Sequence, residues 1–194
     1  MRLENKGMKL LIYFIGPGGA GKTTTAKLLA SQLECTCYDL DEYFMALEGD
    51  IKQYISEKGY ERYASRNLEL FFALKEKLQS NSINVIVCSS GFMTYPDQVH
   101  GGYIKIKKEV ENHPFTFLLL PSLDLERCVQ LIVKRQMARS YLNSKVEKEE
   151  FKIRSRFNIY AGLKCHLIST EQAPHMVVAR VLARLNALAP LNFL

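Results

Sequence analysis

Five short apolar runs punctuate the chain, and their length and β-branched or aromatic content predict β-strands. They span residues 9–15, 35–39, 84–89, 115–120 and 164–169. The run Val85-Ile86-Val87 is continuously apolar rather than alternating, which is typical of a strand covered on both faces. The pattern therefore predicts a sheet that lies buried between two other layers.

Helical patterns separate these runs. Apolar positions in residues 59–78 recur near the 3.6-residue period, and residues 21–33 and 123–139 are also predicted to be helical. A last helix is expected to start near Pro174, a favourable first-turn residue, and to bury Val178, Val181, Leu182 and Leu185. Strands that alternate with helices favour an α/β fold in three layers, with a five-stranded parallel sheet between helices. Ligands of such sheets bind beyond the carboxyl ends of the strands.

Composition points to one globular domain over residues 1–194. Apolar residues make up 47% of the 194 positions and charged residues 24%, and no repeat or linker divides the chain. No apolar run approaches the roughly 18–20 residues of a membrane span. The short apolar stretch 10–15 runs into a glycine-rich loop rather than a cleavage site, so a cytoplasmic location without membrane contact is expected. The five cysteines form no CxxC pair and are predicted to be free thiols in a reducing compartment.

The net charge of +6 raises the question of a nucleic-acid partner. The chain has no Lys/Arg block and no aromatic–basic ladder, so no such partner is predicted. Arginines between Arg127 and Arg156 carry much of the excess charge, and in a nucleotide enzyme they would meet polyphosphate. A solvated helix face explains several of the lysines equally well.

The strongest single motif follows the first predicted strand. Gly16-Pro17-Gly18-Gly19-Ala20-Gly21-Lys22-Thr23 matches G-x-x-x-x-G-K-[ST], with a helix pattern directly after it. Such a loop points successive N–H groups and a helix N-terminus at phosphates. Lys22 is expected to reach the β- and γ-phosphates of ATP, and the Thr23 hydroxyl to coordinate Mg²⁺. The predicted nucleotide-binding residues are Gly16, Gly18, Gly19, Ala20, Gly21, Lys22, Thr23 and Thr24. A chance glycine-rich turn is the alternative, and the flanking strand and helix disfavour it.

Two carboxylates follow the second predicted strand. Asp39 and Asp41 are two residues apart, so at a strand end they would project to the same side. One would hold the magnesium shell, and the other would accept a hydrogen bond from the hydroxyl to be phosphorylated. Either residue would also serve as the N-cap of a helical segment 42–47, and capping is compatible with a catalytic role.

The order and spacing of several motifs resemble those of the shikimate kinase family. After the phosphate loop these motifs are Asp39-x-Asp41, Arg66-Asn67-Leu68-Glu69, Ser90-Gly91, Arg139, Arg156-x-Asn158-x-Tyr160 and Pro174. The resemblance extends over residues 9 to 190 and implies a P-loop kinase fold with a mobile lid, placed at about 139–150. That stretch is polar with little apolar periodicity, so it is expected to be poorly ordered without nucleotide.

The resemblance implies roles for the acceptor side of the site. Asp39 would belong to the magnesium shell, and Asp41 would contact the acceptor hydroxyls. Arg66 and Arg156 would bind the acceptor carboxylate, since arginine grips a carboxylate through two parallel hydrogen bonds. Glu69, three residues after Arg66, would orient that arginine. The Gly91 backbone would touch the substrate. Alternatively, Arg66 is a surface helix residue and Arg156 belongs to a charged helix face.

On the nucleotide side, the resemblance makes Arg139 the lid residue that neutralises the transferring phosphate. Arg135 would lie against adenine or phosphate, and Pro174 would fall where the adenine loop begins the last helix. The family's third strand ends in three glycines, whereas this chain has Ser89-Ser90-Gly91. These two serines are where discrimination against shikimate is expected to be decided.

The sequence therefore predicts an ATP- and Mg²⁺-dependent kinase, a monomer or weak homodimer, that phosphorylates a small acceptor bearing a carboxylate, with shikimate the first candidate. A gluconate-type sugar-acid kinase and a nucleoside or nucleotide kinase are alternatives of the same class. A nucleotide-binding regulatory protein without transfer activity would not need Asp41 beside Lys22, Thr23 and Asp39. A nucleic-acid-related NTPase is disfavoured because no aspartate ends the apolar strand at Val87-Cys88-Ser89.

Overall fold

The computed structural model describes residues 10–78, 82–138 and 145–188. The strands are β1 (Leu10–Ile15), β2 (Thr36–Asp39), β3 (Ile83–Val87), β4 (Thr116–Leu120) and β5 (His166–Ser169). They form one parallel sheet in the order β2-β3-β1-β4-β5. The predicted five-stranded parallel sheet is confirmed.

Helices join the strands as the alternating pattern predicts. They are α1 (Lys22–Gln32), α2 (Leu40–Glu48), α3 (Ile51–Lys58), α4 (Tyr60–Lys77), α5 (Tyr103–Asn112), α6 (Leu125–Met137), α7 (Val146–Ala161) and α8 (Pro174–Leu188), with the 3₁₀ turns η1 (Phe92–Thr94) and η2 (Asp97–Val99) after β3. None of the helices in the described ranges has the length and apolar content needed to cross a membrane.

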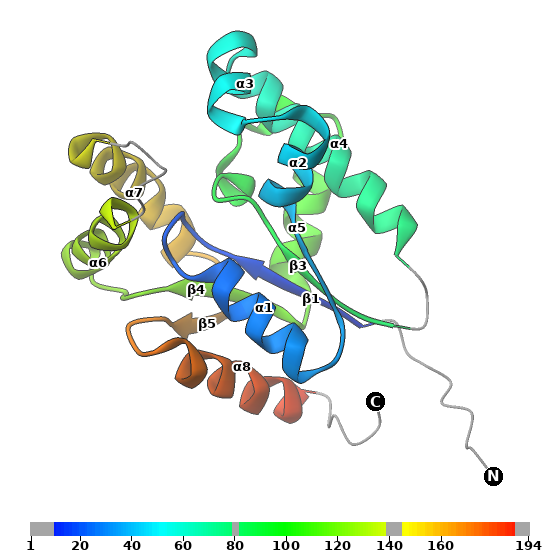
Figure 1. Ribbon diagram of the computed structural model, residues 1–194, viewed down its shortest axis with the longest axis vertical. Coiled ribbons are helices and arrows are strands. Elements are labelled where there is room, and N and C mark those ends of the chain that lie inside the picture. Colours follow the sequence, from blue (N-terminus) through cyan, green and yellow to red (C-terminus); the bar gives the residue numbers. More distant parts are fainter. Residues whose placement is uncertain (1–9, 79–81, 139–144, 189–194) are drawn as a thin grey trace.

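Two hydrophobic cores cover the two faces of the sheet, and β1 shows how its residues divide between them. Ile12 and Phe14 pack into the core beneath α1 and α8, whereas Tyr13 and Ile15 pack into the larger core formed with α2 to α7. Figure 1 shows α1 and α8 together along one side of the sheet. β3 divides in the same way, with Val85 and Val87 in one core and Ile86 in the other, so the prediction that this strand is covered on both faces is confirmed.

The structure describes only the second half of the predicted lid. Residues 139–144, including Arg139, lie outside the described residues. Residues 146–150 form the first turns of α7. The apolar residues that α7 buries, Ile153, Phe157 and Tyr160, all lie after residue 150, so its first turns carry no apolar stripe by which a helix is read from sequence. Figure 1 shows α7 beside α6 near one end of the sheet.

Candidate functional site

The phosphate loop connects β1 to α1 at the carboxyl end of the central strand. Gly21, with φ of 92°, precedes the first helical residue, so the N-terminus of α1 faces the loop. Gly16 has φ of 139°, and a Cβ there would collide with the carbonyl oxygen of Leu119. The buried Lys22 donates from Nζ to the carbonyl oxygens of Gly16 at 2.8 Å and Pro17 at 3.1 Å. Its charge is therefore held within the loop.

The carboxyl end of α6 packs against this loop. A Cβ at Gly18 would lie 2.9 Å from Nε2 of Gln136, and one at Gly19 would lie 3.0 Å from a methyl carbon of Ile132. The Oε1 atom of the buried Gln136 has no hydrogen-bond partner among the described residues. Side chains at positions 18 and 19 would therefore push α6 away from the loop.

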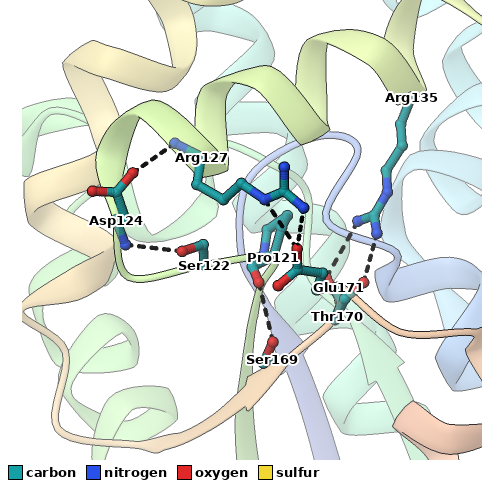
Figure 2. Close-up of polar contacts among 8 residues, drawn as sticks. All are labelled: Pro121, Ser122, Asp124, Arg127, Arg135, Ser169, Thr170 and Glu171. Atoms are coloured by element: carbon teal, nitrogen blue, oxygen red, sulfur yellow. Dashed lines mark hydrogen bonds and ion pairs between the residues drawn. The ribbon is translucent and has the colours of Figure 1, made fainter.

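Arginines of α6 also bind the loop that follows β5 (Figure 2). Arg135 donates from Nη2 to the carbonyl oxygen of Thr170 at 2.5 Å and from Nη1 to that of Gly19 at 3.4 Å. Two turns earlier, Arg127 forms an ion pair with Glu171, and its Nε lies 2.9 Å from Oε1 of that residue. Arg135 thus joins the phosphate loop to the segment leading to Pro174, the exposed first residue of α8.

Asp39 joins β2 to both α1 and α2. Its Oδ2 accepts a hydrogen bond of 2.6 Å from the Thr23 hydroxyl, and its Oδ1 accepts from the backbone N–H groups of Asp41 at 2.9 Å and Glu42 at 3.4 Å. Asp39 is therefore the N-cap of α2 as well as the partner of Thr23. Thr24, one residue further, is exposed on α1.

Asp41 reaches the site from the first turn of α2. The expectation that it lies at a strand end was wrong, because the Asp39 cap starts the helix at Leu40. The Tyr63 hydroxyl donates to Oδ1 of Asp41 at 3.3 Å. Burial raises the pKa of the Asp41 carboxyl, and the charge of Lys22 partly opposes that shift. The Asp41 carboxylate is thus held near Lys22 in a poorly solvated place, where a bound hydroxyl would compete with little water.

The two serines after β3 face different neighbours. Ser89 is buried, and its hydroxyl interacts with Asp41 and Tyr63 electrostatically without reaching hydrogen-bond geometry. The Ser90 Oγ would lie 3.9 Å from a Cβ at Gly18, so this side chain borders the phosphate loop. The carbonyl oxygen of Ser90 accepts from Tyr160 at 2.8 Å.

The two predicted carboxylate-binding arginines have different surroundings. Arg66 donates from Nε to Glu48 at 2.7 Å and from Nη1 to Glu69 at 2.8 Å, so the predicted contact with Glu69 is present and a second carboxylate joins it. Arg156 is half-buried and donates to neutral oxygens, that of the Tyr60 hydroxyl at 3.0 Å and the Ser90 carbonyl at 3.4 Å.

Gly91 lies beneath two aromatic side chains. A Cβ there would collide with the Tyr60 hydroxyl oxygen and lie 2.9 Å from Cε1 of Tyr95. Tyr95 is buried and its hydroxyl donates to Asn67 at 3.1 Å. A side chain at position 91 would therefore have to displace Tyr60 or Tyr95, and the phenol of Tyr60 stands over the backbone that was expected to touch the acceptor.

Sequence reasoning missed three residues of this region: Glu48, Tyr60 and Gln136. Each lies near a predicted site residue only through tertiary packing, so no spacing along the chain reveals it. Within the described ranges no cluster of three or more His, Cys, Asp or Glu side chains is arranged to hold a metal ion. A cation at Thr23 and Asp39 would therefore need further oxygen ligands from nucleotide phosphates and water, which is the coordination that Mg²⁺ usually takes.

Comparison with known proteins yields one family. The family model described as shikimate kinase matches residues 18–186. The shikimate kinase of Persephonella marina is 30% identical over 183 residues, covering 90% of this chain and 98% of its own. The crystal structure of a shikimate kinase from Bacteroides thetaiotaomicron superposes with a TM-score of 0.69 at 18% identity, over 94% of this chain and 99% of that one. A gluconokinase from Sinorhizobium meliloti shares the fold, with a TM-score of 0.59 at 16% identity and coverage of 96% and 95%.

Proposed function

Because this chain belongs to the shikimate kinase family, whose members are ATP-dependent phosphotransferases acting on a hydroxyl group, we propose that its acceptor is a small hydroxy acid, with shikimate the first candidate. The observation that carries the proposal is the junction of Thr23, Asp39 and Asp41. A hydrogen bond of 2.6 Å ties the first two together, and the third lies in the helical turn that Asp39 caps.

On this proposal, the phosphate end of ATP lies in the loop 16–23. Lys22, now bonded to loop carbonyls, would turn its Nζ toward the β- and γ-phosphates and offset their charge. Thr23 and Asp39 fit a magnesium ion because both present oxygen atoms, the ligand type that Mg²⁺ prefers. The bound ion would supply charge neutralisation at the phosphates.

Asp41 is proposed to receive the hydroxyl that is phosphorylated. Its carboxylate would accept the hydrogen bond of that hydroxyl and orient the oxygen for in-line attack. Arg156 would hold the acceptor's carboxylate, since its guanidinium faces neutral oxygens and makes no ion pair with another described residue. Arg66, held between Glu48 and Glu69, would lie at the edge of the acceptor site. Arg139 would contribute from the lid.

A coupled ADP-release assay tests the proposal. Purified protein is supplied with ATP and Mg²⁺ and with shikimate, gluconate or a nucleoside as acceptor. We expect turnover with shikimate, and we expect Lys22→Ala to lower it by a factor on the order of 10² or more, because charge on the transferring group goes unneutralised. Turnover with nucleosides alone would refute the hydroxy-acid acceptor. Near-normal turnover in the Lys22→Ala variant would refute the role of the loop.

A further inference from the structure

Tyr60 occupies the middle of the proposed acceptor site. It is the first residue of α4, directly after Gly59, whose φ of 84° starts the helix at this point. Its hydroxyl oxygen accepts a hydrogen bond of 3.0 Å from Nη2 of Arg156, and the guanidinium carbon lies 5.9 Å from the centre of its ring. Two chain segments far apart in the sequence are thereby joined at one polar group.

The surroundings of Tyr60 include the other groups proposed to meet the acceptor. Its hydroxyl stands over Gly91, where a Cβ would collide with it. Its ring centre lies 5.9 Å from that of Tyr63, whose own hydroxyl donates to Asp41. An acceptor that reaches both Arg156 and Asp41 would therefore pass beside the Tyr60 phenol rather than lie on the Gly91 backbone.

The Tyr60 hydroxyl has a hydrogen to offer. Its oxygen accepts from Arg156, and no hydrogen bond in which Tyr60 is the donor is found within residues 10–78, 82–138 and 145–188. Burial raises the pKa of Tyr60, against the opposing effect of Arg156, so the hydroxyl keeps its proton at neutral pH. A hydrogen bond received from a cation also polarises a phenol and makes it a stronger donor.

The two arginines proposed for the acceptor site differ in how their charges are balanced. Arg66 already lies against the carboxylates of Glu48 and Glu69. Arg156 is half-buried, and its contacts are to uncharged oxygens. A cation in that situation favours an anion beside it, because burial makes its charge costly when it is unbalanced. The excess positive charge is therefore at Arg156, next to the Tyr60 hydroxyl.

From this arrangement we infer that Tyr60 is a further acceptor-binding residue. Its hydroxyl donates a hydrogen bond to the acceptor carboxylate that Arg156 holds, and the two side chains together form the carboxylate-binding group. The inference rests on the proposed function, because it requires a carboxylate-bearing acceptor. Arg66, in this scheme, joins α4 to α2 through Glu48 and makes a smaller contribution to acceptor affinity.

The test compares Tyr60→Phe with the wild-type enzyme on two acceptors, shikimate and its methyl ester. The ester keeps the ring and the hydroxyls but removes the negative charge. Because hydrogen bonds to charged groups are stronger than neutral ones, Tyr60→Phe should raise KM for shikimate about tenfold or more. The KM for ATP should stay unchanged. The KM for the methyl ester, which is already a poor acceptor, should rise much less on the same substitution.

A matched control is Tyr43→Phe, which removes a hydroxyl whose contact is with Lys77, and it should leave both KM values as they are. If wild-type enzyme phosphorylates shikimate but Tyr60→Phe leaves its KM unchanged, or raises both acceptors' KM equally, the inference is wrong while the proposed function stands. If the wild type phosphorylates no hydroxy acid, the proposed function fails and the inference falls with it.

Discussion

Replacing Asp39 separates its structural role from its proposed role in the magnesium shell. One carboxylate oxygen caps α2 through the N–H groups of Asp41 and Glu42, and the other accepts from the Thr23 hydroxyl. Asp39→Asn keeps one side-chain oxygen that can cap α2. Its amide nitrogen replaces the second oxygen and can donate a hydrogen bond to the Thr23 hydroxyl oxygen. Asp39→Ala removes both contacts.

The magnitudes follow from these contacts. Loss of an aspartate N-cap costs about 0.5–2 kcal/mol, and each kcal/mol lowers Tm by roughly 2–4 °C in a chain of this size. Asp39→Ala should therefore lower Tm by several degrees, whereas Asp39→Asn should lower Tm only slightly. Both should lower turnover by a factor on the order of 10² or more, because each removes a negative oxygen next to the metal position.

Thermal unfolding and the ADP-release assay, repeated over a range of Mg²⁺ concentrations, measure the two effects separately. Asp124→Ala is the matched control, since Asp124 caps α6 by accepting from the Arg127 N–H at 2.7 Å, about two helical turns before Ile132 reaches the phosphate loop. It should lower Tm without a loss of turnover. An Asp39→Asn enzyme with normal turnover and normal Mg²⁺ dependence would refute the metal assignment.

Two further predictions concern the acceptor side. Asp41→Asn should abolish turnover yet raise the free energy of unfolding at pH 7. Folding raises the pKa of the Asp41 carboxyl, so its charge lowers the stability of the folded wild type. This destabilisation is absent below the unfolded pKa of about 4 and develops as pH rises through the folded pKa. Equal unfolding free energies of mutant and wild type at pH 7 would contradict the prediction. Gly91→Ala should destabilise the fold by about 1–3 kcal/mol through its collision with the Tyr60 hydroxyl, as measured by denaturant unfolding, and Tyr60→Phe should recover part of that loss. An additive double mutant would show that the two side chains do not share this space.

Local sequence signals located the strands and the phosphate loop well. Over the described residues, both ends of each predicted strand lie within two residues of the observed ends. Continuous apolar runs between turn residues leave few other positions for a strand to begin or end. The loop 16–23 is recognisable because its glycines serve backbone geometry, which depends on neighbours in the chain. The role of Asp39 is local for the same reason, since a cap involves the next three residues.

The arrangement of residues on the acceptor side was harder to predict, because it depends on contacts between segments that are far apart in the sequence. Asp41 was placed at a strand end because the helix was expected to start at residue 42, two residues after its observed start at Leu40. The first turns of α7, residues 146–150, were assigned to the lid because the apolar residues that the helix buries begin only at Ile153. Tyr60 lies 3.0 Å from Arg156 only after α4 and α7 have both packed around the end of β3. Such a contact follows from the assembled fold and not from spacing.

The shared space at Gly91 and Tyr60 also constrains how this site changes over evolutionary time. A side chain at position 91 is unfavourable while Tyr60 is present, whereas loss of the Tyr60 hydroxyl meets no such obstacle. The cost of a substitution at position 91 therefore depends on which residue occupies position 60, so the order in which the two positions change affects how stable the intermediate protein is. The neighbouring Tyr95 ring would still limit the size of a side chain at position 91 after a change at position 60.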